Sequence, residues 1–220
     1  MKKITLNKNG QKSEIEVGKI VCVGRNYVAH AEELGNEVPA FPLIFLKPPS
    51  NLIFNGDVIV HPDYSNEMHH EVELVLLIGK TVKDADEKSA EKAIAGYAVG
   101  LDMTLRDIQS ELKKKGHPWT LAKCFDGAAA ISEVVSSEEI DFSGKEKISL
   151  KVNDELRQNS NLNKMIFSPI EIVKYISSKM TLEKGDLIYT GTPKGVNKVA
   201  RGDKLFADIE NIGKLEVEIK

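Results

Sequence analysis

The sequence predicts a mainly β fold of the α+β class, with mostly antiparallel strands and a few helices. Short apolar strands outnumber the helical segments, and several of them alternate apolar and polar residues, as half-buried strands do. No regular succession of strand, helix and strand runs along the 220 residues, so a doubly wound parallel sheet is not expected.

Turn residues and alternation define the elements at the start of the chain. Residues 1–18 form a predicted hairpin, because apolar positions alternate on both sides of the tight-turn pair Asn9-Gly10. The next predicted elements are a strand over 20–23 that ends at Gly24, a helix over 28–34 that stops at Gly35, and a strand over 43–46 that ends at two prolines.

Longer apolar runs and a capping motif define the rest of the chain. Ser168-Pro169-Ile170-Glu171 combines a capping serine, a proline at the first helical position and a glutamate three residues after the cap, so we expect a helix to about Lys179. Alternation around Asn211-Ile212-Gly213 predicts a C-terminal hairpin over 205–219. The other predicted elements are strands over 58–60, 72–78, 95–101 and 187–189 and helices over 85–93 and 105–115.

Composition and charge exclude several classes of function. The 30 Lys and Arg residues are mixed with 33 Asp and Glu residues, and the net charge of -3 argues against a nucleic-acid binder. No apolar run reaches the roughly 18 residues that span a bilayer, and the start lacks the apolar run of a signal peptide. Cys22 and Cys124 lack CxxC spacing, which favours two free thiols in a reducing compartment. We expect one cytoplasmic domain over 1–220 that binds neither nucleic acid nor a membrane.

Three acidic residues lie at the ends of predicted buried strands. Glu71 and Glu73 stand two residues apart at the start of the 72–78 strand, so both project from one face of it. Asp102 directly follows the 95–101 strand. Carboxylates held that close repel one another unless one is protonated or a cation lies between them. An all-oxygen site of this kind suits Mg²⁺ or Mn²⁺ better than Zn²⁺ or Cu²⁺.

The same residues also allow a purely structural interpretation. Glu71 and Glu73 would then form the solvated face of an edge strand, and Asp102 would cap the helix that follows. His69 and His70 are left out of the metal site, because neutral imidazole favours softer ions and adjacent strand residues face opposite ways.

His30 and Glu33 are three residues apart on the predicted 28–34 helix and share one of its faces. Glu33 can therefore accept a hydrogen bond from one ring nitrogen of His30 and leave the other free as a base, which can take a proton from water at neutral pH. The alternative is an incidental pair on a surface helix.

A third group combines Arg106, Gln109 and Lys123. Arg106 and Gln109 share a face of the predicted 105–115 helix, near the proposed metal site. Lys123 follows Leu121-Ala122, where it either is buried with an anion or snorkels from a strand edge. The run Lys113-Lys114-Lys115 is interpreted as a solvated helix end.

The loop Gly191-Thr192-Pro193-Lys194-Gly195 follows the predicted strand over 187–189. It lacks the spacing of a phosphate-binding loop, so no nucleotide site is expected. Its hydroxyl and backbone amides can still hold a carboxylate.

Taken together, these motifs resemble the fumarylacetoacetate hydrolase family. The resemblance covers nearly the whole chain from about Lys19 onward, and the short chain is most similar to the small acylpyruvate hydrolases that also decarboxylate oxaloacetate. The five motifs are Gly24-Arg25-Asn26-Tyr27 with His30 and Glu33, His70-Glu71-Val72-Glu73-Leu74, Gly100-Leu101-Asp102-Met103-Thr104 with Arg106 and Gln109, Trp119-Thr120-Leu121-Ala122-Lys123, and Gly191-Thr192-Pro193-Lys194-Gly195-Val196.

The resemblance implies a mixed β-sandwich roll, usually a homodimer, that binds Mg²⁺ or Mn²⁺ and acts on a small 2-oxo acid. It also implies a short lid that orders over bound substrate and carries a pair of residues that activates water. The implied site residues are Glu71, Glu73 and Asp102 for the metal, His30 and Glu33 for water activation, Lys123 and Gln109 for stabilising negative charge, and Arg25, Arg106 and Thr192 for contacts with the substrate.

The implied activity is hydrolysis of the C–C bond of 3-acylpyruvates, of the acetylpyruvate or fumarylpyruvate type, to pyruvate and a carboxylic acid. Hydrolysis is favoured because His30 and Glu33 are present and decarboxylation needs no activated water. Three alternatives stay open: an oxaloacetate decarboxylase or keto-enol tautomerase, an isomerase or decarboxylase of 2-hydroxy-diene-dioates in aromatic catabolism, and a non-catalytic module stabilised by a metal. The chain starts close to the core, which argues against fumarylacetoacetate itself as substrate.

Overall fold

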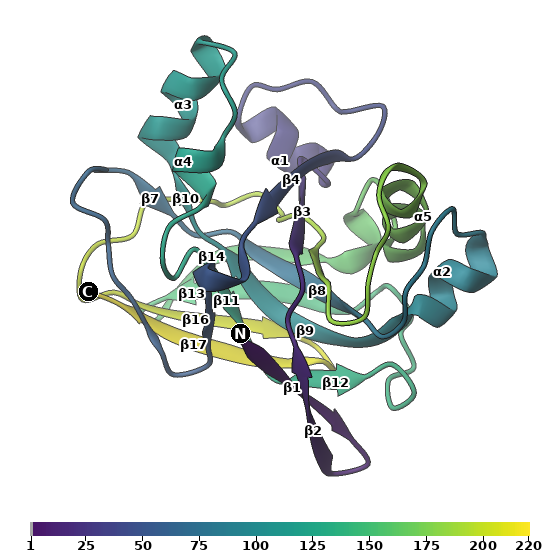
Figure 1. Ribbon diagram of the computed structural model, residues 1–220. Coiled ribbons are helices and arrows are strands. Elements are labelled where there is room, and N and C mark those ends of the chain that lie inside the picture. Colours follow the sequence, from purple (N-terminus) through teal and green to yellow (C-terminus); the bar gives the residue numbers. More distant parts are fainter. Residues whose placement is uncertain (1) are drawn as a thin grey trace.

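The computed structural model describes residues 2–220 (Figure 1). Met1, the first residue of the predicted 1–18 hairpin, lies outside the described residues. The strands are β1 (Lys3–Lys8), β2 (Gln11–Glu16), β3 (Ile20–Gly24), β4 (Leu43–Lys47), β5 (Leu52–Phe54), β6 (Val58–Ile59), β7 (Met68–His69), β8 (Val72–Ile78), β9 (Ile94–Asp102), β10 (Thr104–Leu105), β11 (Ala129–Ile131), β12 (Val134–Ser136), β13 (Lys147–Val152), β14 (Glu155–Asn161), β15 (Leu187–Tyr189), β16 (Lys204–Ile209) and β17 (Gly213–Ile219). The α-helices are α1 (Val28–Glu33), α2 (Glu87–Ala93), α3 (Arg106–Lys114), α4 (Thr120–Lys123) and α5 (Pro169–Lys179), and short 3-10 turns cover Pro49–Asn51 and Leu162–Lys164.

The strands form two sheets and one short ribbon. The larger sheet has ten strands in the order β2-β1-β12-β9-β8-β15-β3-β4, with β11 joining β9 to β5 at the side. The smaller sheet has five strands in the order β14-β13-β16-β17-β6, and β7 pairs with β10. Most neighbouring strands are antiparallel, and the parallel pairs are β1 with β12, β5 with β11, β3 with β15, and β6 with β17. The prediction of a mainly β fold with a few helices is confirmed.

The central strand β8 is buried on both faces. Its even-numbered residues, such as Leu74 and Leu76, pack in the core that also contains Leu150 of the smaller sheet. Its odd-numbered residues Val75 and Leu77 belong to a second apolar cluster on the opposite face. A strand that is apolar on both faces fits only the interior of a sheet, which explains the continuous apolar run in this segment.

Strand pairing brings distant segments of the chain to one edge of the larger sheet. Because β3 and β15 are parallel, their carboxyl ends lie together, and the side-chain amide of Asn26 donates to the Thr190 carbonyl over 2.7 Å. Because β8 and β9 are antiparallel, the start of one meets the end of the other, and the Asp102 N–H donates to the Glu71 carbonyl over 2.9 Å. In Figure 1 the helices α1, α3 and α4 gather beyond this edge.

Most predicted elements are found within a residue or two of their expected bounds, including the hairpin turn at Asn9-Gly10, where both residues have positive φ. The strand-edge interpretation of Lys123 is wrong, because residues 120–123 form the short helix α4 and the Lys123 N–H donates to the Trp119 carbonyl. The sequence analysis identified no elements over 129–161, where the structure has four strands, β11 to β14. Within residues 2–220 no helix is both long and apolar enough to cross a membrane.

Candidate active site

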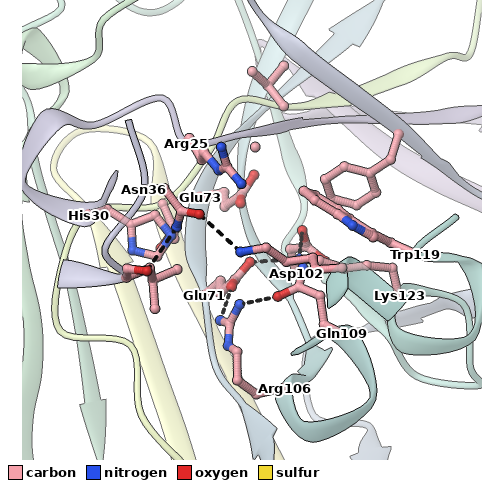
Figure 2. Close-up of a pocket in the computed structure, with 16 residues that line it drawn as sticks. Arg25, His30, Asn36, Glu71, Glu73, Asp102, Arg106, Gln109, Trp119 and Lys123 are labelled. Carbon is pink, nitrogen blue, oxygen red and sulfur yellow. Dashed lines mark hydrogen bonds and ion pairs between the residues drawn. The ribbon is translucent and has the colours of Figure 1, made fainter. Parts of the chain in front are cut away.

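A pocket opens where α1, α3 and α4 meet the ends of β3, β8 and β9 (Figure 2). Nine of the ten candidate residues predicted from the sequence line it, and the tenth, Glu33, lies behind His30. The wall also contains residues to which the sequence analysis gave no role in the site, among them Asn36, Phe45 and Trp119. The rings of Phe45 and Trp119 lie 5.8 Å apart and form an aromatic side of the pocket.

The three carboxylates lie together at the bottom of this pocket. One oxygen each of Glu71, Glu73 and Asp102 can be chosen so that all three lie within 4.8 Å of one another. Glu71, just before the interior strand β8, is 5% exposed, and Glu73, within that strand, is 1% exposed. The alternative of a solvated edge strand is therefore wrong. Asp102 does not cap the following helix either, because the residue preceding α3 is Leu105.

Cationic side chains surround two of these carboxylates. The Lys123 ammonium lies 2.8 Å from Glu71 Oε2 and 2.7 Å from Asp102 Oδ2, and Arg106 pairs with Glu71 Oε1. Burial alone would raise the pKa of Glu71, but Lys123 and Arg106 hold it well below its usual range. Burial also works against the charge of Lys123, yet Asp102 and Glu71 raise the pKa of that ammonium. Lys123 is therefore buried with anions, as one of the two sequence-based interpretations predicted.

Glu73 has a different environment. Burial and the neighbouring carboxylates of Asp102 and Glu71 raise its pKa well above 4.5, against the effect of the Gly191 N–H that donates to Glu73 Oε2 over 2.8 Å. No Lys, Arg or His side chain among residues 2–220 forms an ion pair with Glu73. The cluster is thus short of positive charge on this side, and a divalent cation would relieve the repulsion there.

His30 and Glu33 form the predicted pair on α1. His30 Nδ1 lies 3.4 Å from Glu33 Oε2, and the imidazole is only 4% exposed. With a proton on Nδ1 donated to Glu33, Nε2 is the basic nitrogen. Burial lowers the pKa of His30 from 6.5, although Glu71 and the hydrogen bond to Glu33 oppose this. A pKa below 6.5 keeps the ring mostly neutral at pH 7. His30 is buried and Glu33 is exposed, so the pair connects the pocket wall to the surface of α1.

Arg106 fixes the orientation of the Gln109 amide. Its Nη1 donates to Gln109 Oε1 over 2.7 Å, so the donating nitrogen of Gln109 is the end left for other partners. The predicted shared face of the 105–115 helix is thus found in the structure, although Arg106 contacts Glu71 and Gln109 rather than pointing freely into the pocket.

The loop over 191–195 binds carboxylates of the protein itself. Gly191 N–H donates to Glu73, and Gly195 N–H donates to both oxygens of Glu33, over 2.9 Å and 3.1 Å. Gly195 has a φ of +98°, and a Cβ there would lie 2.1 Å from the Arg157 carbonyl oxygen, so only glycine fits. This loop therefore joins the metal-ligand candidates to the histidine pair.

Gln158 of β14 holds the middle of this loop and was missed in the sequence. Its Nε2 donates to Thr192 Oγ1 and to the Pro193 carbonyl, both over 2.8 Å. Its Oε1 lies 3.0 Å from His70 Nδ1 and accepts from the Val72 N–H over 3.1 Å. The side chain is fully buried, and its contacts with His70 and Val72 lie on either side of Glu71 in the sequence. Nothing in the polar strand Glu155–Asn161 distinguishes this residue, so no sequence signal was available.

Lys47 was also missed. This lysine is 1% exposed, and its ammonium lies 2.8 Å from Asp102 Oδ1 and donates to the carbonyls of Met103 and Ala128. A signal did exist, because Leu43, Phe45 and Lys47 alternate along one strand and the lysine continues a series of apolar residues. Each carboxylate oxygen of Asp102 therefore forms an ion pair with a lysine, Oδ1 with Lys47 and Oδ2 with Lys123.

Residues 19–220 match the family described as fumarylacetoacetate (FAA) hydrolase, C-terminal, and the chain belongs to this family. Among its relatives, the mitochondrial oxaloacetate tautomerase FAHD1 of Bos taurus is 45% identical over 206 residues, which cover 93% of both chains. The fumarylpyruvate hydrolase of Pseudomonas aeruginosa, solved with Mn²⁺ and pyruvate, superimposes with a TM-score of 0.94 at 36% identity and covers 99% of this chain and 95% of its own. A 5-carboxymethyl-2-hydroxymuconate delta-isomerase of Mycobacterium smegmatis has a TM-score of 0.82 at 34% identity, with coverages of 94% and 80%.

The residues of this pocket fit a divalent cation. The donor set is three buried carboxylates, which suits hard cations that bind oxygen. Burial and the carboxylates of Asp102 and Glu71 raise the pKa of Glu73, and a cation among the three carboxylates would offset this repulsion. His30 and Gln109 line the same pocket as the three carboxylates.

Proposed function

We propose that this protein is a divalent-metal-dependent enzyme that hydrolyses the C–C bond of 3-acylpyruvates and releases pyruvate and a carboxylic acid. The observation that carries the proposal is the buried imidazole of His30, which lines the same pocket as the three carboxylates and has Glu33 Oε2 3.4 Å from its Nδ1. Glu71, Glu73 and Asp102 hold Mg²⁺ or Mn²⁺ in this proposal. The bound ion would polarise the 2-oxo group and stabilise the negative charge that develops on the pyruvate part.

His30 is the general base of the hydrolysis. Its neutral Nε2 takes a proton from water, and the hydroxide attacks the distal acyl carbonyl. Glu33 keeps the ring oriented and stabilises the imidazolium that forms, and the Gly195 N–H holds Glu33 in place. When the C–C bond breaks, its electron pair goes to C3 of pyruvate as the enolate, which takes up a proton there.

Lys123 and Gln109 stabilise the oxyanion that forms at the acyl carbonyl. The amide nitrogen of Gln109 is the donor for this purpose, because Arg106 occupies its oxygen. Lys123 supplies a full positive charge in a buried site, where its interaction with a new negative charge is strong. Arg25, Arg106 and Thr192 complete the substrate contacts in the proposal.

A second candidate activity is keto-enol tautomerisation or decarboxylation of oxaloacetate. The oxaloacetate tautomerase relatives, at 45% identity over 93% of both chains, favour it. Tautomerisation moves a proton between C3 and the 2-oxygen without breaking a C–C bond, so the same base and the same enolate stabilisation suffice. One of the structural relatives is a delta-isomerase, which keeps isomerisation among the candidate activities.

The test is the release of pyruvate from acetylpyruvate, fumarylpyruvate and oxaloacetate, measured with Mg²⁺ and again with EDTA, together with the ultraviolet absorbance of enol-oxaloacetate. Metal-dependent hydrolysis of an acylpyruvate faster than oxaloacetate turnover supports the proposal. Turnover of oxaloacetate alone would favour the second candidate, and metal-dependent melting without any turnover would leave only a structural metal.

Two further expectations belong to the same proposal. The family resemblance predicts a homodimer, which sedimentation of the purified protein tests. The two free cysteines, Cys22 and Cys124, are consistent with a location in the reducing cytoplasm, and fractionation of the source cells tests it.

A further inference from the structure

The rim of the pocket carries positive charge that no carboxylate of the protein neutralises. At the bottom of the pocket, the carboxylates pair with Lys47, Lys123 and Arg106. Arg25 and Lys113 also line the pocket, yet neither forms an ion pair with any Asp or Glu among residues 2–220. These two side chains form the cationic rim.

Lys113 lies on the face of α3 that carries Arg106 and Gln109 and lines the pocket. It lies seven residues after Arg106 and four after Gln109, so the three side chains follow one another along one side of the helix. Lys113 is exposed in the last turn of α3, as the interpretation of a solvated helix end predicted. It also lines the pocket, whereas its exposed neighbours Lys114 and Lys115 do not. Lys113 occupies the outer turn of the face that carries Arg106 and Gln109 inside.

The partner of Lys113 is a neutral amide. Its ammonium donates to Asn36 Oδ1 over 3.0 Å, and Asn36 follows α1, the helix that carries His30. An amide oxygen satisfies one hydrogen bond but leaves the charge uncompensated. Partial burial and the nearby cations Arg25 and Arg106 lower the pKa of Lys113, as expected for an ammonium in an excess of positive charge.

Arg25 is held at the rim by a strained backbone. It has a φ of +58°, a left-handed conformation that costs a non-glycine residue roughly 1 kcal/mol or more. The next residue, Asn26, fixes this turn, because its side chain bonds to the Thr190 carbonyl and to the backbone of Phe167. Figure 2 shows Arg25 and Asn36 on the side of the pocket that faces away from Arg106 and Gln109.

We propose that Lys113 and Arg25 form a subsite for a second carboxylate of the substrate, so that the enzyme prefers dicarboxylic 2-oxo acids over monocarboxylic ones of the same length. The inference rests on the proposed function, in which the 2-oxo acid end lies at the three carboxylates. A substrate that reaches the rim with a carboxylate replaces the neutral Asn36 contact by a charge-assisted hydrogen bond. An uncharged end would leave Lys113 and Arg25 without an anionic partner.

The first test uses two acylpyruvates that differ only at the far end, fumarylpyruvate and crotonylpyruvate, in which a methyl group replaces the terminal carboxylate. Lys113→Met should lower kcat/KM for fumarylpyruvate about ten- to one-hundred-fold, the usual effect of losing a hydrogen bond to a charged group. The value for crotonylpyruvate should change less than about two-fold. Lys113→Arg should retain most of the preference, and Lys114→Met is the matched control on the same helix.

Lys113 could instead have a structural role, in which its hydrogen bond to Asn36 holds the segment after α1 in position. Asn36→Ala removes that contact and keeps the charge. If Lys113→Met lowers kcat/KM equally for both substrates, and Asn36→Ala does the same, the subsite is overturned and Lys113 has the structural role. A selective loss on the dicarboxylic substrate in Lys113→Met alone supports the subsite.

A binding measurement separates this inference from the proposed hydrolysis. The probes are 2-oxoadipate and 2-oxohexanoate, which have the same chain length, differ by the terminal carboxylate and lack the acyl carbonyl needed for cleavage. Calorimetry on the Mn²⁺-loaded protein should show tighter binding of 2-oxoadipate, with the difference erased in Lys113→Met and reduced by salt. Equal binding of both probes to the wild type would overturn the subsite whatever reaction the enzyme catalyses, whereas a preference that depends on Lys113 supports it even if no acylpyruvate is hydrolysed.

Discussion

Replacing Gln158 by methionine tests how the pocket is held together. Methionine has nearly the same volume and shape, so the change leaves little cavity and acts through hydrogen bonds. It removes two donated bonds, to Thr192 and Pro193, and two accepted ones, from His70 and Val72. At about 0.5 to 1.5 kcal/mol net for each bond, the free energy of unfolding should fall by about 2 to 6 kcal/mol.

The same substitution should impair catalysis in an enzyme that remains folded. Without Gln158, the 191–195 loop loses its central anchor, and its contacts with Glu73 and Glu33 lose their fixed geometry. We expect kcat/KM for acylpyruvates to fall at least about ten-fold, since small displacements of positioned groups are costly. Gln158→Glu keeps the acceptor side and should show an intermediate loss of stability.

Urea unfolding and steady-state kinetics measure both effects. Ser132→Ala is the control, because Ser132 is a buried side chain away from the pocket whose hydroxyl accepts from the Val99 N–H over 3.0 Å. It should cost about 1 kcal/mol and leave kcat/KM unchanged. A loss of stability in Gln158→Met below about 1 kcal/mol, or wild-type kcat/KM in that variant, would refute the positioning role of Gln158.

Three further predictions concern the histidine and the second buried lysine. His30→Ala should abolish acylpyruvate cleavage and spare part of any oxaloacetate decarboxylation, both followed as pyruvate release, whereas equal loss of the two activities would contradict water activation by His30. Burial lowers the pKa of His30 from 6.5, so the imidazole stays neutral as the pH falls through that value. The kcat/KM for acylpyruvates should therefore decline only below pH 6.5. A decline that starts at higher pH would contradict the assignment of His30 as the general base. Lys47→Met leaves Asp102 Oδ1 without its ion pair, so the free energy of unfolding, measured with urea in the presence of EDTA, should fall by about 3 to 5 kcal/mol. The control is Leu46→Met at the neighbouring half-exposed position, which should change the free energy of unfolding by less than about 0.5 kcal/mol.

The carboxylate cluster was predictable because it depends on local rules. Glu71 and Glu73 share a face by the two-residue period of a strand, and the apolar runs after Glu71 and before Asp102 predict buried strands. The pairing of those strands then brings Asp102 to Glu71, as the antiparallel register shows. The His30–Glu33 pair follows in the same way from helical spacing.

The supporting residues were not predictable, because their roles depend on contacts between distant segments. Gln158 lies in a polar strand and acquires its role only because that strand packs beside the 191–195 loop. Lys113 looked like one of three equivalent lysines until the fold placed one side of α3 against the pocket. The strands over 129–161 were missed for a related reason, since they are short or polar and are stabilised by pairing with partners far along the chain.

The contact between Gly195 and Glu33 has a consequence for how the protein folds. The two residues are 162 positions apart, and the two strands that lead to them, β3 and β15, pair in parallel. Such long loops close slowly, because their conformational entropy is lost before the contacts that reward it are made. The pocket should therefore form in the last phase of refolding. The single tryptophan, Trp119, lies in the pocket wall against Phe45, so its fluorescence reports the completion of the active site rather than the early collapse of the sheets.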